Sequence, residues 1–322
     1  MSSSKASKEI KASKEIDELN GSEDDGLEYW RTDVAKIRDD STHGSIYLAN
    51  QALDIVDDFV RRQLYKNRTE LIQALSKLSN ALVRAKPLMA LIYNRTRHVL
   101  IFIQNIPKEQ KDINSIRDAT LEEIVQIRQR AEDNVKVITR WGCRLILDHH
   151  VILTHSASSV VESILMEARR QKKRFRVICT ESRPLNEGTQ MAYRLAKAGI
   201  KVRLVPDADI ARAVEECHFV LTGTDRFTET TFVNKTGTHA IAVMAKHMNK
   251  SLFVAGETAK VLLKRTYPVR FVQNNPKELV SKLSDNLQVE NIYFEESPIS
   301  MADKIILEDG VFELKEFVDR YL

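Results

Sequence analysis

The chain has 322 residues, which is enough for two domains and a sizeable core. Its 49 basic and 45 acidic residues give a net charge of +4, too balanced for a protein that binds DNA through a concentrated basic face. No apolar run approaches the roughly 20 residues that cross a bilayer, and the amino terminus lacks the apolar segment of a signal peptide. We therefore expect a cytoplasmic protein without a DNA or membrane partner.

The first 27 residues differ in composition from the rest of the chain. The hexapeptide KASKEI occurs twice in tandem, at residues 5–10 and 11–16, and an acidic, glycine-containing stretch follows at 21–26. Such a segment cannot bury enough apolar surface to offset the entropy that it loses on ordering. We expect residues 1–27 to form a disordered tail, with a frayed helix or a docking peptide as the alternatives.

Apolar residues recur at three- and four-residue spacing from Tyr29 to about Leu147, the pattern of amphipathic helices. The expected helices span residues 46–59, 69–86, 88–104 and about 120–147. Pro87 separates the second helix from the third, because proline cannot continue a helix. This pattern predicts an antiparallel helical domain over residues 28–147.

The period changes after Asp148, where short apolar runs alternate with helix-length amphipathic segments. The runs are residues 151–153, 175–179, 202–205, 219–221, 252–255 and 291–294. Such alternation is typical of βαβ units and a mainly parallel sheet. We expect an α/β protein in which a Rossmann-like domain, residues 148–322, follows the helical domain.

Three polar motifs each follow an apolar run, where a strand would end. They are THSASS at residues 154–159, TESRP at 180–184, and TGTD at 222–225 with NKTGT following at 234–238. Ligands bind at the carboxyl ends of the strands in doubly wound sheets, so we expect the motifs to share one pocket.

The serines of the first motif lie where a helix should begin, near Ser158. Hydroxyls and free backbone N–H groups at the positive end of a helix dipole suit a phosphate. The alternative is that Ser156 or Ser158 only caps the helix, and this motif taken alone favours the cap. His155 lies in the same predicted cleft.

The other motifs supply charged and amide groups. Arg183 offers a fork of donors suited to phosphate, with a surface ion pair as the alternative. Asp225 follows an apolar run directly, where a carboxylate would face the cleft as an acid or base. Asn234 and Lys235 precede a helix near His239 and suit a phosphate or a sugar hydroxyl. The histidines and the three cysteines lack metal-ligand spacing, so we expect no metal site and no cofactor.

These motifs, in this order and spacing, resemble a family that joins translation factors and isomerases. It contains the alpha, beta and delta regulatory subunits of eukaryotic initiation factor 2B, their archaeal relatives, and the isomerases of ribose 1,5-bisphosphate and methylthioribose 1-phosphate. The similarity is dense over residues 151–260, where it includes VNKTGT and ETAK, and thinner through KPLMALIYN and FEESP. The resemblance implies the two domains described above and a homodimer or hexamer assembled through the carboxyl-terminal domains.

The resemblance also implies roles for single residues. In the isomerases a cysteine and an aspartate transfer protons; Asp225 matches the aspartate, and Ser156 stands at the cysteine position. A serine hydroxyl is a far weaker acid than a thiol. The family positions that bind phosphate correspond to Arg183, Asn234 and Lys235.

Two further positions differ from the family pattern. The usual Arg-Gly pair near the start of the first domain is His43-Gly44 in this chain, and Ala259 replaces the tyrosine of the usual E-T-Y-K-F. Together with the serine, these differences favour a regulatory subunit that binds a sugar phosphate or nucleoside monophosphate without catalysis. Such a subunit would contact sister subunits and initiation factor 2.

Two alternatives remain open. One is an aldose-1-phosphate isomerase of the ribose-1,5-bisphosphate type, in which Asp225 moves the proton and His155 or Ser156 replaces the cysteine. The other is a scaffold whose pocket is vestigial and binds no small phosphate.

Overall fold

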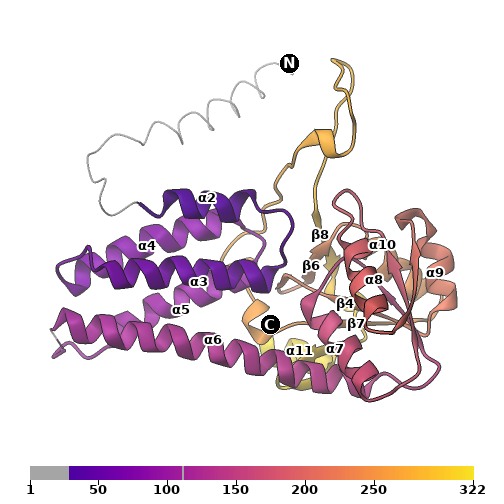
Figure 1. Cartoon of the computed structure of the whole chain (residues 1–322), viewed down its shortest axis with the longest axis horizontal. Helices are drawn as coiled ribbons and strands as arrows, with labels where there is room; N and C mark the ends of the chain where they lie inside the picture. Colours follow the sequence, from indigo (N-terminus) through magenta and orange to yellow (C-terminus); the bar gives the residue numbers. More distant parts are fainter. Residues whose placement is uncertain (1–28, 111) are drawn as a thin grey trace.

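The computed structural model describes residues 29–110 and 112–322, so the predicted tail, residues 1–27, lies outside the described residues. Helices come first along the described chain, and the strands follow (Figure 1). The helices of the amino-terminal half are α2 (Arg31–Asp39), α3 (Ser45–Arg62), α4 (Arg68–Ala85), α5 (Ala90–Asn105) and α6 (Ile113–Arg144).

The largest difference from the predicted helices is at the start of α6, which begins at Ile113 and not near residue 120. Asp112 caps this end, because its carboxylate accepts hydrogen bonds from the backbone N–H groups of Asn114 and Ser115 at 3.3 and 3.0 Å. The prediction followed the apolar stripe that begins at Ile124 and overlooked the capping aspartate.

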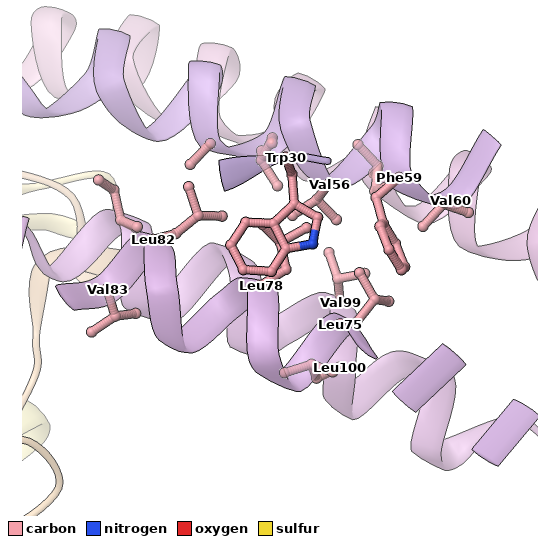
Figure 2. Close-up of a cluster of buried hydrophobic side chains, with 14 of the residues drawn as sticks. Trp30, Val56, Phe59, Val60, Leu75, Leu78, Leu82, Val83, Val99 and Leu100 are labelled. Atoms are coloured by element: carbon pink, nitrogen blue, oxygen red, sulfur yellow. The ribbon is translucent and has the colours of Figure 1, made fainter. Parts of the chain in front are cut away.

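These helices share one apolar core, part of which Figure 2 shows. Trp30, just before α2, points into it together with Phe59 of α3, Leu78 of α4 and Val99 of α5. Each large apolar side chain buried in this way contributes about 1.5–3 kcal/mol. Packing of the apolar faces therefore stabilises the helices more than the helix propensity of any one segment does.

A seven-stranded sheet forms the centre of the carboxyl-terminal half, in the order β10-β9-β7-β4-β1-β2-β3. All neighbouring pairs are parallel except β9 and β10, which confirms the predicted mainly parallel sheet. Its strands are β1 (Val151–Thr154), β2 (Arg176–Thr180), β3 (Lys201–Val205), β4 (Phe219–Gly223), β7 (Ser251–Ala255), β9 (Lys304–Leu307) and β10 (Gly310–Glu313).

Apolar side chains alternate between the two faces of this sheet, so helices cover both. In β1, Ile152 belongs to the core under α7 and α8, whereas Val151 and Leu153 belong to the core under α9, α10 and α11. These helices are α7 (Ser159–Arg170), α8 (Glu187–Lys197), α9 (Ile210–Glu216), α10 (Thr238–His247) and α11 (Leu314–Tyr321). Short 3₁₀ helices are η1 (Asp207–Asp209), η2 (Thr258–Lys260), η3 (Pro276–Glu278) and η4 (Ile299–Met301).

A second, three-stranded sheet was not predicted. It consists of β5 (Arg226–Phe227), β6 (Thr231–Lys235) and β8 (Phe294–Pro298), paired antiparallel. The strand expected at residues 291–294 in the parallel sheet is wrong in both position and partner, since β8 begins at Phe294 and pairs with β6. Its sequence, FEESP, ends in a proline that an edge strand tolerates. The long connection between β7 and β8 extends away from the body of the molecule (Figure 1).

Strand order in the main sheet reverses between β1 and β4. The chain runs from β1 outward through β2 to β3, then returns to β4 on the other side of β1. Ligands bind in doubly wound sheets at the carboxyl ends of the strands beside such a reversal. The motifs that begin at the ends of β1 and β4 therefore flank the expected crevice.

Candidate functional site

A cleft of about 690 Å³ lies at this reversal, between the helices and the carboxyl ends of the strands. Residues 40–47, Asn50, Lys86 and Met89 line it from the helical side, which we call the helical wall. Loops after β1, β2 and β4, the start of α8 and the end of β6 line the opposite side, the sheet wall. In Figure 1 the connection between α2 and α3 lies on the side of the helices that faces the strands.

Ser156 begins the sheet wall at the end of β1. Its backbone adopts a left-handed conformation, with φ of 65°, and its N–H donates to Ser182 Oγ at 2.8 Å. The Ser156 hydroxyl donates to Glu187 Oε1 at 3.1 Å. The Ser156 hydroxyl is therefore already hydrogen-bonded to a carboxylate of the protein.

Ser158 caps α7, as one of the two sequence interpretations expected. Its hydroxyl accepts a hydrogen bond from the N–H of Val161 at 3.4 Å. The neighbouring strand β4 ends at Gly223, where a Cβ would lie only 2.4 Å from Ser158 Oγ. A glycine is thus required for β4 to approach the amino end of α7.

Asp225 lines the cleft after β4, and its backbone joins the two walls. Its carbonyl accepts a hydrogen bond from the N–H of Ala90, the first residue of α5, at 3.2 Å. Its carboxylate has no hydrogen-bond partner among the described residues and lies near Lys260. The Lys260 Nζ donates to the Thr224 carbonyl at 2.5 Å. Burial lowers the pKa of Lys260, and the negative charge of Asp225 opposes that shift.

Asn234 and Lys235, which were expected to precede a helix, extend the sheet wall at the end of β6. The Asn234 amide donates to the hydroxyls of Thr222 and Thr238, both at 2.9 Å. Lys235 Nζ is buried and lies 2.7 Å from Glu187 Oε1, without the alignment of a hydrogen bond.

The amino end of α10, expected as an anion site, is already occupied by a carboxylate of the chain. Glu295 Oε1, in β8, accepts hydrogen bonds from the N–H groups of Gly237 and His239 at 2.8 and 2.7 Å. A phosphate at this helix end would have to displace Glu295. Sequence reasoning could not reveal this contact, because Glu295 comes from a strand that is distant along the chain.

His155 and Arg183 are the two predicted site residues that do not line the cleft. His155 is 2% exposed; its Nδ1 lies 2.6 Å from Thr180 Oγ1 and its Nε2 lies 2.9 Å from the Thr236 carbonyl. Burial lowers the pKa of His155 and favours the neutral ring. Arg183 is exposed, and its backbone N–H donates to Asp207 Oδ2 at 2.7 Å.

His43 and Gly44 line the helical wall. The His43 ring stacks on Tyr47 with centroids 3.9 Å apart, and its Nδ1 lies 2.7 Å from Asp40 Oδ2. Gly44 is the N-cap of α3 and supplies no side-chain acceptor, so the first N–H groups of this long helix remain available at the cleft. Lys86 Nζ donates to the Asp40 carbonyl at 2.6 Å, and burial lowers the pKa of Lys86.

Sequence reasoning missed six charged side chains that line the cleft: Asp40, Lys86, Glu162, Glu187, Arg194 and Lys260. Lys86 and Lys260 belong to stretches noted for family resemblance, and only their roles went unassigned. Glu187 opens α8 three residues after the TESRP motif, so its place beyond a strand end was the available signal. Arg194 makes two 2.8 Å hydrogen bonds with Glu162, a contact between helices that one sequence does not reveal.

The described residues contain no group of side chains arranged to hold a metal ion. Among the same residues, none of the helices has the length and apolar character needed to span a membrane.

Comparison with known proteins identifies the family. The model of the initiation factor 2 subunit family matches residues 41–314. The chain belongs to this family. A putative translation initiation factor eIF-2B subunit 2-like protein of Pyrococcus horikoshii is 30% identical over 239 residues, covering 74% of this chain and 80% of the relative. A ribose 1,5-bisphosphate isomerase of Methanocaldococcus jannaschii is 27% identical, covering 86% of this chain and 89% of the relative.

A solved structure shares the fold as well. The crystal structure of the Pyrococcus horikoshii translation initiation factor eIF-2B matches with a TM-score of 0.76 at 25% identity, covering 89% of this chain and 98% of that chain. The initiation factor 2 subunit family thus includes relatives named as translation factors and relatives named as isomerases. Family membership therefore does not separate a translation factor from an isomerase, and the residues that line the cleft are needed to do so.

No cysteine of this family member lines the cleft. Cys143, Cys179 and Cys217 are all buried in the cores. Burial raises the pKa of Cys179 to about 12 and that of Cys217 to about 11, so neither thiol is an acid near neutral pH.

Proposed function

We propose that this chain is a non-catalytic subunit of the initiation factor 2B type that binds a sugar phosphate or nucleoside monophosphate in the cleft. The observation that carries the proposal is Ser156, at the position of the isomerase cysteine, whose hydroxyl donates a hydrogen bond to Glu187 Oε1. A thiol has a pKa of about 8.5 and exchanges its proton readily, whereas a serine hydroxyl is a far weaker acid. Neither Cys179 nor Cys217 supplies a substitute at the cleft.

The size and lining of the cleft support ligand binding. Its 690 Å³ fall within the range of about 300–1,000 Å³ typical of small-molecule sites. On the helical wall, the uncapped amino end of α3 and the Lys86 ammonium suit a phosphate, because both favour negative charge. Asn234 and Asp225 on the sheet wall suit the hydroxyls of a sugar.

Calorimetric titration with aldose 1-phosphates and nucleoside monophosphates tests this assignment. Replacing Lys86 with glutamine should weaken binding about tenfold, or about 1.4 kcal/mol, because it removes a positive charge beside the phosphate. The matched control is Lys246→Gln, an exposed lysine in the last turn of α10 and outside the cleft. Equal affinities for the wild type and Lys86→Gln would mean that the phosphate binds elsewhere.

We also propose that the subunit assembles with copies of itself or with sister subunits. Exposed apolar side chains gather on the long connection between β7 and β8, where Phe271, Val272 and Leu283 are 42–50% exposed. Apolar groups of this kind mark protein–protein contacts when they form a continuous surface. The resemblance to initiation factor 2B subunits implies such an assembly and contact with initiation factor 2. Sedimentation of the purified chain would give a monomer mass if the proposal is wrong.

An aldose-1-phosphate isomerase is the second candidate, because Asp225 is retained in the cleft with no hydrogen-bond partner for its carboxylate among the described residues. In that case Asp225→Asn abolishes turnover, since an amide cannot accept and return the proton. If the subunit is regulatory, the same variant leaves assembly unchanged.

A further inference from the structure

We propose that Glu187 selects the ligand: it makes the sheet wall accept the hydroxyls of a monophosphate and exclude the second phosphate of a bisphosphate. This inference rests on the proposed binding function and adds which class of phosphate the cleft takes. It concerns a residue to which sequence reasoning gave no role, although Glu187 lines the sheet wall and contacts both Ser156 and Lys235.

The positive charge of Lys235 is already matched within the chain. Its Nζ lies 2.7 Å from Glu187 Oε1 and 5.1 Å from the centroid of the Tyr293 ring, and the side chain is 2% exposed. A carboxylate and an aromatic face both stabilise an ammonium ion. An anion that reaches Lys235 must therefore compete with Glu187.

Glu187 is fixed in its position by its surroundings. It is the first residue of α8, where the helix dipole favours a negative charge. The Ser156 hydroxyl donates to its Oε1 at 3.1 Å, and its side chain is 19% exposed. A carboxylate that is held on two sides and stabilised by a helix end is costly to displace by a second anion.

The hydrogen-bonding needs of this pair match a hydroxyl better than a phosphate. Glu187 Oε2 is buried without a donor, and Lys235 Nζ is buried without an aligned acceptor, among the described residues. One hydroxyl group can both donate to the carboxylate and accept from the ammonium. An ionised phosphate only accepts, and its charge repels Glu187.

The remaining charges of the sheet wall are also paired within the chain. Arg194 makes two 2.8 Å hydrogen bonds with Glu162. Lys260 donates to the Thr224 carbonyl and lies near Asp225, so its charge is also opposed by a carboxylate. On the helical wall, the carboxylate of Asp40 accepts from the N–H groups of Thr42 and His43, whereas the amino end of α3 has no side-chain cap. A single phosphate at the helical wall, with hydroxyls at Glu187, satisfies both walls.

The test compares ribose 5-phosphate with ribose 1,5-bisphosphate by calorimetric titration of the whole protein. We expect the wild type to bind the monophosphate at least tenfold more tightly. Glu187→Gln keeps an acceptor for Ser156 but removes the charge, and should shrink this preference at least tenfold. Glu167→Gln, which removes one carboxylate from the Arg170 ion pair on α7 outside the cleft, should leave the preference unchanged.

Several outcomes would overturn the inference. A wild type that binds the bisphosphate as tightly as the monophosphate contradicts it, and so does a Glu187→Gln variant with an unaltered preference. If that variant does not fold, Lys235→Gln serves instead: it leaves Glu187 without its counter-ion and should strengthen discrimination against the bisphosphate. Wild-type protein that binds neither compound refutes the proposed function as well, which distinguishes the two failures.

Discussion

Replacing Arg95 with methionine should destabilise the protein strongly at neutral pH and much less in acid. Arg95, in α5, lies 3.4 Å from both carboxylate oxygens of Glu257, and the side chains are 4% and 1% exposed. This buried ion pair joins the helical half to the sheet. Burial lowers the pKa of Arg95 and raises the pKa of Glu257, so each charge depends on the other for compensation.

The size of the loss follows from the carboxylate that Arg95→Met leaves behind. Neutralising a carboxyl group of ordinary pKa 4.5 at pH 7 costs about 3.4 kcal/mol, at about 1.36 kcal/mol per pH unit. Leaving Glu257 buried without Arg95 cannot cost more than this neutralisation energy, because the carboxylate can take up a proton. Losing the 2.8 Å hydrogen bond from Arg95 to Asn50 adds about 1 kcal/mol, and the nearby Lys260 offsets part of the total. We expect a loss of about 3 kcal/mol.

The pH dependence identifies the cause. In the variant, the pKa of Glu257 is higher in the folded state than in the unfolded state, so the folded state binds more protons above pH 4.5. Its stability therefore falls as pH rises from about 4.5 to 7. At pH 5 the neutralisation cost is only about 0.7 kcal/mol, and the deficit relative to wild type should shrink by more than about 2 kcal/mol.

Urea unfolding at pH 7 and pH 5 measures both quantities. The double variant Arg95→Met/Glu257→Leu should recover most of the stability, because apolar groups often replace a buried ion pair without loss. Arg61→Met, which breaks an exposed pair with Asp57 on α3, should leave the free energy of unfolding unchanged. The reasoning is refuted if Arg95→Met costs less than about 1 kcal/mol at pH 7, or costs the same at both pH values.

Further predictions concern Gly237, the buried thiols and Asp225. Gly237→Ala should destabilise the protein by about 1–3 kcal/mol, because φ is 108° there and a Cβ would lie 2.9 Å from the His155 ring. Urea unfolding measures this loss, and an unchanged unfolding midpoint would mean that the loop relaxes freely. The thiols should react with Ellman's reagent far more slowly in the native protein than in denaturant. Burial raises the pKa of Cys179 to about 12 and that of Cys217 to about 11. Rapid labelling of the native protein would show that the cores open. Asp225→Asn should leave the sedimentation coefficient unchanged, and a shift would give the carboxylate a structural role.

The helices and the parallel strands could be predicted because local patterns determine them. In β1 the alternation of Val151, Ile152 and Leu153 between two cores is visible in the sequence as a short apolar run. The second sheet could not be predicted, because β5 is only Arg226–Phe227 and its arginine is fully buried. The Arg226 guanidinium donates to carbonyls of residues 262–268, a contact between distant segments that offsets the burial of its charge.

The candidate site was predictable only where strand ends bring residues together. Ser156, Asp225 and Lys235 line one cleft because β1, β4 and β6 end beside it. A strand end does not determine the direction of each side chain: His155, next to Ser156, is buried against Thr180 and Thr236 and does not line the cleft. Nor does a sequence reveal an internal counter-ion such as Glu187, which depends on how α8 approaches β6.

Ligand-observed NMR of the purified protein tests the central claim most directly, because one experiment reports both binding and conversion. The panel consists of aldose 1-phosphates, ribose 1,5-bisphosphate and nucleoside monophosphates. Our account predicts that a monophosphate binds and that its signals persist without a new species. Appearance of a ketose phosphate would contradict it and establish an isomerase that works with Ser156 where its relatives use a cysteine.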